Sequence, residues 1–222
     1  MIELLFPNLR LEQFWKATID TLYMAGLAGT ATFVLGLLIG TVLFLTSPGQ
    51  LLANRLVYGA LSLATNIFRS IPFIILIVLL IPVTRFLVGR MLGVNAALPA
   101  LVVGAAPFYA RLVEIAFREV SKGVIEATRS MGGGIGTIIF KVLIPEAGPG
   151  LASGLTVTLI SLVGYTAMAG VIGAGGLGHL AYLEGFQRNN GDVTLAATGM
   201  VLVIVFAIQF VGDLATRKLD KR

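Results

Sequence analysis

The sequence predicts an all-α membrane protein that forms one domain over residues 1–222 and crosses the bilayer five times. Of its 222 residues, 57% are hydrophobic and only 12% are charged, and the mean hydropathy is +0.95. A soluble globular domain carries about 25% charged residues. One run without any charged residue extends from Thr21 to Asn54, and about 20 apolar residues suffice to cross a bilayer as a helix.

Five apolar stretches give the expected transmembrane helices. They lie at about residues 21–45, 56–83, 91–110, 151–172 and 193–212. The first ends at a Ser-Pro-Gly turn signal at residues 47–49. The second carries Arg69 and Pro72 near its middle, and the third is punctuated by Pro99 and Pro107.

Residues 1–20 precede the first span and differ from a cleavable signal peptide. They combine Leu, Phe and Trp with Arg10, Glu12, Lys16 and Asp20, and they have no short apolar core followed by a small-residue cleavage site. This mixture favours an amphipathic segment at the membrane surface that is not processed.

The distribution of lysine and arginine predicts the orientation, because cytoplasmic segments of membrane proteins carry an excess of both. Five spans put the two termini on opposite sides, with ten cations on the C-terminal side and five on the other. The ten are Arg55, Arg111, Arg118, Lys122, Arg129, Lys141, Arg217, Lys218, Lys221 and Arg222, and the five are Arg10, Lys16, Arg85, Arg90 and Arg188. We therefore expect the C-terminus in the cytoplasm and the N-terminus outside. The net charge of +5 reflects this bias rather than nucleic-acid binding, and the absence of cysteine excludes disulfides and thiolate metal sites.

The largest predicted cytoplasmic segment, residues 111–149, contains a helical hairpin. Its apolar positions recur at helical spacing and form one stripe. They are Met131, Ile135, Ile138, Ile139 and Val142. Four glycines within residues 132–136 disfavour a continuous helix, so we expect a short helix ending near Met131, a glycine turn and a second short helix ending before Pro145. Such a hairpin either rests on lipid headgroups or docks into a groove on a soluble partner.

The spacing within this hairpin resembles the EAA loop of permease subunits of bacterial ABC importers. That pattern is Glu-Ala-Ala, three residues, Gly, nine residues, then Ile-x-Leu-Pro. Thr128, Val142 and Ile144 depart from it by small or apolar exchanges. In that family the segment is a coupling helix that inserts into a cleft on the ATP-binding subunit. The resemblance implies this role for Glu126, Ala127, Thr128, Gly132, Val142, Ile144 and Pro145.

Two longer stretches are similar to the permeases of methionine importers. They are "NIFRSIPFIIL" at residues 66–76 and "LVGYTAMAGVIGAGGLG" at residues 162–178, and the similarity extends over about residues 18–218. The resemblance implies the type I ABC importer permease fold in the inner membrane, a homodimer, two ATP-binding subunits and an external substrate-binding protein. It implies transport of methionine, with D-methionine as a further candidate. Because related importers share parts of both stretches, another small solute such as glycine betaine is the alternative.

The sequence does not predict an enzyme or a cofactor site. It lacks the G-x-x-x-x-G-K-[ST] loop, so ATP and Mg²⁺ are expected to bind a partner subunit. Residues 173–178 match the dinucleotide pattern G-x-G-x-x-G, with Asp192 downstream. A dinucleotide site needs a preceding β-strand, and here a Gly- and Ala-rich span precedes the pattern, which favours a tight turn. His179 has no metal-ligand partner at a suitable spacing and is interpreted as a loop residue.

Four residues are candidates for the translocation path. Arg69 is the one ionisable residue near the middle of an expected span, where it either faces the path or tethers neighbouring carbonyls exposed by Pro72. Ser161, Tyr165 and Met168 in the fourth span suit the wall of a path for a thioether amino acid, although ordinary helix packing explains them too.

Five spans are few to enclose a path, which favours a symmetric dimer with the path on its twofold axis. Gly36 and Gly40 form a G-x-x-x-G pattern that predicts a close helix contact, within one chain or between two. One rival function is an ion-coupled carrier, which usually needs acidic residues or histidine inside the membrane, whereas no acidic residue is central to an expected span. Another is a membrane scaffold that recruits a soluble partner through the same hairpin.

Overall fold

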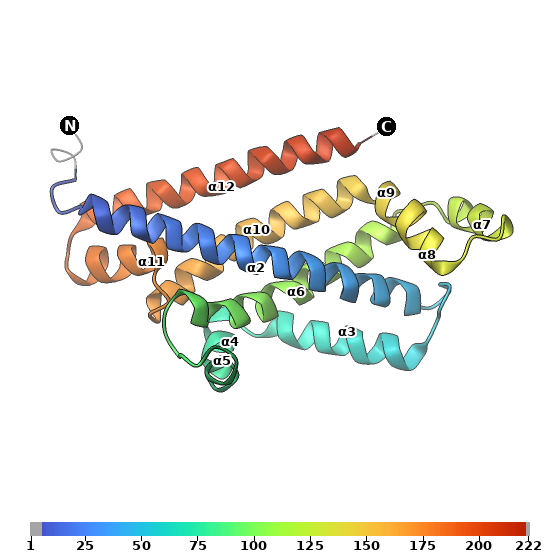
Figure 1. Cartoon of the computed structure of the whole chain (residues 1–222), viewed down its shortest axis with the longest axis horizontal. Coiled ribbons are helices and arrows are strands. Elements are labelled where there is room, and N and C mark those ends of the chain that lie inside the picture. Colours follow the sequence, from blue (N-terminus) through green and yellow to red (C-terminus); the bar gives the residue numbers. More distant parts are fainter. Residues whose placement is uncertain (1–5, 221–222) are drawn as a thin grey trace.

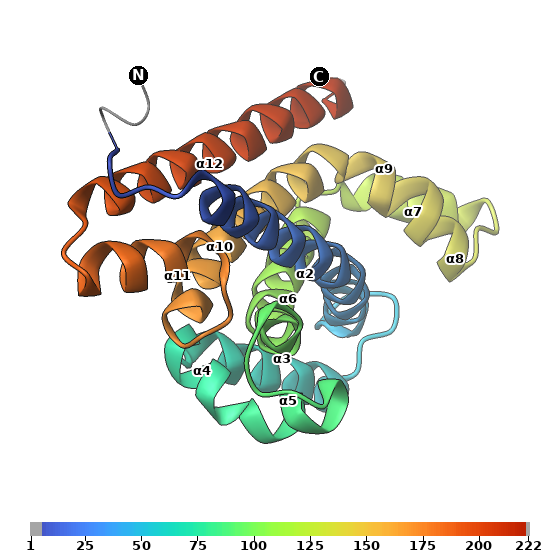
Figure 2. The ribbon, with the colours of Figure 1, turned by 60° about the vertical axis from the view of Figure 1, so that its left-hand side comes forward.

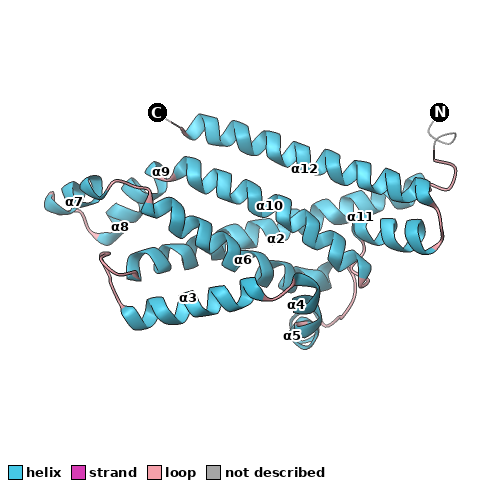
Figure 3. Cartoon of the chain, turned by 180° about the vertical axis from the view of Figure 1, so that it is seen from behind, coloured by secondary structure: helices cyan, strands magenta, loops and turns pink. Residues whose placement is uncertain are grey.

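The computed structural model of the chain describes residues 6–220, which form helices and loops without any strand (Figure 1 and Figure 3). In chain order the helices are α2 (Leu11–Thr46), α3 (Arg55–Ser70), α4 (Phe73–Leu79), α5 (Ile81–Val88), α6 (Val94–Arg118), α7 (Lys122–Ser130), α8 (Ile135–Ile138), η1 (Ile139–Leu143), α9 (Ile144–Glu146), α10 (Gly148–Val171), α11 (Gly176–His179), η2 (Leu180–Gln187) and α12 (Gly191–Leu219).

Within the described residues, four helices are long and apolar enough to cross a membrane: α2, α6, α10 and α12. The pair α3 and α4 gives a fifth candidate, but it is bent by 107°. The expected second span, residues 56–83, is therefore not one straight helix. Its break has a local cause, since a residue before proline disfavours the helical conformation and Ile71 is extended, with φ −80° and ψ 122°.

Two further helix boundaries differ from the sequence prediction. Both helices extend beyond the charge-free stretches that defined the expected spans, because charged residues at their ends are compatible with the helix. Residues 11–20 of the expected surface segment form the first turns of α2, whereas residues 6–10 are a loop and residues 1–5 lie outside the described residues. The third helix, α6, does not stop near residue 110 but continues to Arg118 with Pro99 and Pro107 inside it.

Helix α6 occupies the centre of the bundle, with α2, α3 and α10 packed around it (Figure 1). In its most apolar stretch 61% of the residues are buried, against 11% in α12, which is the least buried of the four long helices. Figure 2 shows α12 on one side of the α2–α6–α10 core and α4 with α5 on the other.

The G-x-x-x-G pattern of α2 mediates a contact within the chain. A Cβ atom on Gly36 would lie 2.7 Å from Cδ1 of Tyr109, and one on Gly40 would lie 2.5 Å from the carbonyl oxygen of Ala110. The two glycines therefore allow α2 to pack directly on the backbone of α6.

The two ends of the bundle differ in content. Helices α7–α9, the α2–α3 loop and the end of α12 lie at one end, which we call the hairpin end, whereas the start of α2 and α11 lie at the opposite end (Figure 1). The loop and hairpin cations of the predicted cytoplasmic side thus gather at the hairpin end. Lys221 and Arg222 lie outside the described residues.

The glycine-rich stretch at residues 173–178 is a tight turn between α10 and α11. Gly173, Gly175 and Gly176 have φ angles of 98°, 89° and 80°, which favour glycine. No strand precedes this turn within residues 6–220, so the dinucleotide interpretation has no structural support. His179 ends the short helix α11 instead of lying in a loop, and its Nδ1 is 3.1 Å from the carbonyl oxygen of Gly170.

Candidate coupling hairpin and transport path

The hairpin at residues 122–146 has two helical arms joined by a glycine turn, as predicted. The first arm, α7, ends at Ser130, and the turn follows at residues 131–134. The expectation that the second arm ends before Pro145 is wrong, because α8, η1 and α9 continue to Glu146. Over Ile139–Leu143 this arm has the wider hydrogen-bonding pattern of a π-helix, which accommodates a proline that has no N–H to donate.

Gly132 ends the first arm in a Schellman motif. Its φ of 81° lies in the left-handed region, and its N–H donates to the carbonyl of Arg129 at 2.9 Å. The N–H of Gly133 donates to the carbonyl of Thr128, also at 2.9 Å. The glycine of the EAA-like pattern is therefore required by backbone conformation, since a Cβ atom there would meet nothing within 4 Å.

Gly132→Ala is expected to loosen the hairpin, because a left-handed conformation costs an L-residue about 1–2 kcal/mol. Hydrogen–deuterium exchange of residues 122–134 should become faster than in the wild type. The matched control is Gly136→Ala in α8, where a Cβ atom also meets nothing within 4 Å and φ is not positive. Equal exchange in the two variants would show that the turn does not depend on Gly132.

The predicted apolar stripe divides between two faces of the hairpin. Ile138 and Val142 are buried, together with Ile125, in a cluster that contains Phe44 of α2 and Phe117 of α6. Ile139 is partly buried against the same cluster. This inner face anchors the hairpin to the ends of two long helices.

The outer face of the hairpin presents large apolar side chains to the surroundings. Met131 is 81% exposed, Phe140 is 70% exposed and Ile135 is 41% exposed. Exposed apolar residues grouped on a rigid element are typical of a docking surface. Helical periodicity identified Met131 and Ile135 but not Phe140, and it could not show which positions of the stripe face outward.

The other residues of the EAA-like pattern differ in exposure, and Ile144 packs against the inner cluster. Glu126, Ala127 and Pro145 are exposed, and Thr128 and Ile144 are half-buried. Glu126 also lines a cavity of about 160 Å³ between α7 and the α2–α3 loop. The other residues that line it are Gly49, Gln50, Leu51, Lys122, Ile125 and Arg129.

The candidate path residues of the fourth span lie along α10. The ring of Tyr165 stacks on that of Phe73 in α4, with centroids 4.5 Å apart and planes inclined by 6°. The Ser161 hydroxyl donates to the carbonyl of Val157 at 3.0 Å, and Met168 is 46% exposed. Positions at helical spacing form a continuous exposed or half-buried face of α10: Ser153, Val157, Ser161, Gly164, Met168 and Val171.

Arg69 lies in the last turn of α3, directly before the break, and its side chain is exposed. Its guanidinium carbon is 5.8 Å from the centroid of the Phe108 ring. Within residues 6–220 it makes no hydrogen bond to a backbone carbonyl, so the tether considered from the sequence does not form. Phe73, four residues later, stacks on Tyr165, so the segment directly after the break contacts α10.

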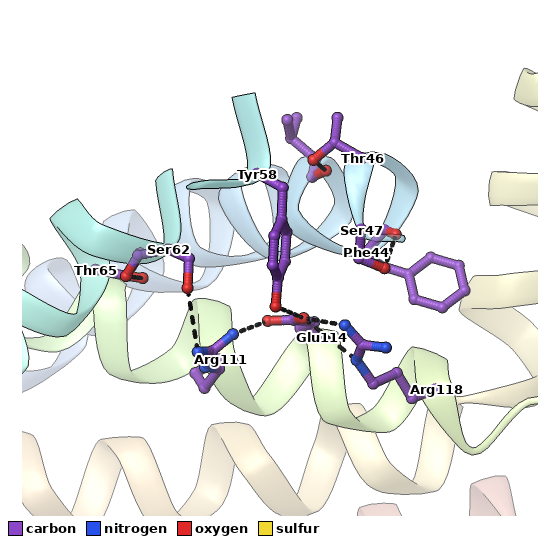
Figure 4. A network of polar contacts seen from close by, with 10 residues as sticks. Phe44, Thr46, Ser47, Tyr58, Ser62, Thr65, Arg111, Glu114 and Arg118 are labelled. Atoms are coloured by element: carbon purple, nitrogen blue, oxygen red, sulfur yellow. Dashed lines mark hydrogen bonds and ion pairs between the residues drawn. The ribbon is translucent and has the colours of Figure 1, made fainter. Parts of the chain in front are cut away.

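A buried ionic network that the sequence reading missed joins α3 to α6 near the hairpin end (Figure 4). Glu114 is 1% exposed and pairs with Arg111 and with Arg118, whose Nη2 is 2.7 Å from its carboxylate. The Tyr58 hydroxyl donates to the same carboxylate at 3.4 Å, and Arg111 donates to the Ser62 hydroxyl at 3.4 Å. The i, i+3 and i, i+4 spacing of the three charges was the signal that could have revealed it.

This network bears on the ion-coupled carrier considered above. Glu114 does lie in a candidate membrane-spanning helix, but only four residues from its end, and two arginines already pair with it. It has the surroundings of a structural ion pair rather than of a residue that binds a coupling ion.

Comparisons with known proteins agree with this fold. A family model described as "Binding-protein-dependent transport system inner membrane component" matches residues 32–222. The methionine import system permease protein MetP of Bacillus subtilis (strain 168) is 60% identical over 222 residues, which cover all of both chains. The probable D-methionine transport system permease protein MetI of Vibrio cholerae serotype O1 is 45% identical over 206 residues, covering 93% of this chain and 92% of the relative.

Solved structures give the same result. One described as inward-facing conformations of the MetNI methionine ABC transporter, in its CY5 native crystal form, has a TM-score of 0.93 at 46% identity and covers 95% of this chain and 98% of that chain. An amino acid ABC transporter with histidines has a TM-score of 0.75 at 21% identity over 94% of both chains, which indicates a shared fold. The fold class predicted from the sequence is confirmed, and the chain belongs to the family of binding-protein-dependent transport system inner membrane components.

Proposed function

We propose that this chain is the permease subunit of an ATP-driven methionine importer and that its hairpin couples the permease to a separate ATP-binding subunit. The observation that carries the proposal is the outer face of the hairpin, where Met131 and Phe140 are exposed on an element anchored by its inner face. Relatives at 60% and 45% identity bear the names of methionine permeases, which supports methionine as the substrate.

The proposed assembly is a permease homodimer in the inner membrane with two ATP-binding subunits and an external substrate-binding protein. The resemblance to the MetNI transporter supports this assembly. ATP and Mg²⁺ bind the partner subunits, and the permease chain holds no cofactor of its own. The C-terminus and the hairpin lie in the cytoplasm and the N-terminus lies outside, in agreement with the cations gathered at the hairpin end.

In this assembly, closure of the ATP-binding subunits moves the two hairpins, and alternating access follows from the motion of the helices attached to them. The hairpin packs against Phe44 in α2 and Phe117 in α6, so movement of the hairpin reaches both helices directly. Ser161 and Met168 then line the path on the exposed face of α10, and Tyr165 lies at the edge of this face, where it stacks on Phe73.

Met131→Glu and Phe140→Glu test the docking surface. Both side chains are largely exposed, so the permease should fold, but a charge should be excluded from an apolar groove. We expect each variant to lose the ATP-binding subunit during copurification and to lose ATP-driven uptake. Leu52→Glu is the control, since Leu52 is 46% exposed at the same end but lies outside the hairpin.

If the Met131 and Phe140 variants retained the ATP-binding subunit at the wild-type ratio, the coupling role of the outer face would be wrong. The substrate is tested separately by competition of methionine, D-methionine and glycine betaine for uptake into proteoliposomes. If glycine betaine alone competed for uptake, it would be the substrate in place of methionine, and the coupling proposal would be unaffected.

A further inference from the structure

We propose that Arg69 binds the carboxylate of the amino acid in transit, beside an apolar wall formed by Tyr165, which stacks on the buried ring of Phe73. This inference rests on the proposed function and names the group that recognises the substrate within the membrane. The relevant observations are the depth of Arg69, its unused hydrogen-bond donors and its aromatic neighbours.

Arg69 lies near the middle of the bundle. Phe108, which its guanidinium contacts, is ten residues from the hairpin end of α6 at Arg118 and fourteen from the other end at Val94. At a rise of about 1.5 Å per residue, these separations are about 15 Å and about 21 Å. An arginine that faces lipid at this depth costs about 2.5–3.5 kcal/mol, so its exposed side chain is expected to face a water-filled path or the second subunit.

The guanidinium group of Arg69 has free hydrogen-bond donors. Its guanidinium carbon lies over the ring of Phe108, 5.8 Å from the centroid, a cation–π contact that uses none of its five N–H donors. Within residues 6–220, these N–H groups have no hydrogen-bond or ion-pair partner. A carboxylate fits the edge of a guanidinium group with two parallel hydrogen bonds.

The apolar wall begins about one helical turn away. Phe73 contacts the position of Gly104, where a Cβ atom would lie 3.2 Å from its ring, and Phe108 is four residues further on the same face of α6. Tyr165 stacks on Phe73 and extends the wall to α10. Phe73 is buried, with 6% of its surface exposed, so the half-buried ring of Tyr165 is the part of this wall that a thioether can contact along its edge. The carboxylate site at Arg69 is thus about one helical turn from the beginning of the apolar wall. This separation matches the distance between the carboxylate and the side chain of an apolar amino acid.

The experiment uses the complete complex, with ATP-binding subunits and substrate-binding protein, reconstituted into proteoliposomes and supplied with radiolabelled methionine. Arg69→Gln removes the charge but keeps a side chain of similar length, and Arg69→Lys restores the charge. Arg55→Gln is the matched control, because Arg55 is an exposed arginine at the other end of the same helix.

We expect Arg69→Gln to reduce methionine uptake about tenfold or more, as the loss of a hydrogen-bonded charge implies. ATP hydrolysis without the binding protein should stay within about twofold of the wild type. Arg69→Lys should recover part of the uptake, and Arg55→Gln should leave it unchanged. Wild-type uptake in Arg69→Gln would overturn the inference, as would a parallel loss of uptake, ATP hydrolysis and copurification, which would assign Arg69 a structural role. Absence of methionine uptake by the wild-type complex would instead reject the proposed function.

Discussion

Glu114→Ala is expected to destabilise the permease by about 3 kcal/mol, because it leaves two arginines without the carboxylate that compensates them. The Arg111 side chain is only 23% exposed, so water cannot fully replace the lost partner. For a chain of this length the corresponding decrease in Tm is about 6–12 °C. Thermal unfolding of the purified complex, followed by size-exclusion chromatography of the remaining soluble fraction, measures it.

The control for this variant is Glu119→Ala. Glu119 follows directly after the same helix and is exposed, so its removal should change Tm little. Tyr58→Phe separates the two halves of the network, since it removes the contact from α3 and keeps both arginine pairs. We expect a smaller decrease in Tm for Tyr58→Phe than for Glu114→Ala. Equal Tm values for the Glu114 and Glu119 variants would contradict a stabilising role of the network.

Gly40→Ala is expected to lower the stability of the permease, although less than Glu114→Ala does. The added Cβ atom would lie 2.5 Å from the carbonyl oxygen of Ala110 and 2.6 Å from Cβ of Val113, and the first of these belongs to the backbone of α6. Because that backbone cannot move away as a side chain could, α2 and α6 must separate. Overpacking of this kind costs about 1–3 kcal/mol, which the same measurement of Tm detects.

Gly26→Ala provides a control on the same helix. A Cβ atom there meets nothing within 4 Å, and alanine is the better helix former by about 1 kcal/mol. We therefore expect a Tm equal to or above that of the wild type. If both glycine variants melted at the same temperature, the close packing of α2 on α6 would not matter for stability.

The helices and the hairpin were predictable because both depend on local sequence. Charge-free apolar runs gave the long helices, and the glycines at residues 132–134 gave the turn. The bend after Ser70 was not predicted, although Pro72 was noticed. A proline weakens a helix locally, but whether the chain kinks slightly or turns by 107° depends on the space left by neighbouring helices.

The candidate site was less accessible from the sequence. In the sequence, Arg111 and Arg118 indicated only the orientation of the chain in the membrane. Their shared ion-pair partner, Glu114, became evident only in the structure. Similarly, periodicity grouped Ile138 with Met131, whereas packing against α2 and α6 buries the first and leaves the second exposed. Helical spacing identifies one face of an element, but only tertiary packing determines what that face contacts.

The break between α3 and α4 also affects how well the membrane stays sealed. The last four carbonyls of an α-helix have no hydrogen-bond partner within the helix. In α3 these carbonyls belong to residues 67–70 and therefore lie at about the same depth in the bundle as Arg69. In hydrocarbon each such carbonyl costs several kcal/mol, so we expect water in the path to hydrate them wherever the second subunit does not cover them. Water at this depth offers a route for protons and sodium ions to leak down their gradients. The fixed positive charge of Arg69 repels both, and the residue proposed to attract an anionic carboxylate would thereby also limit the leak of cations.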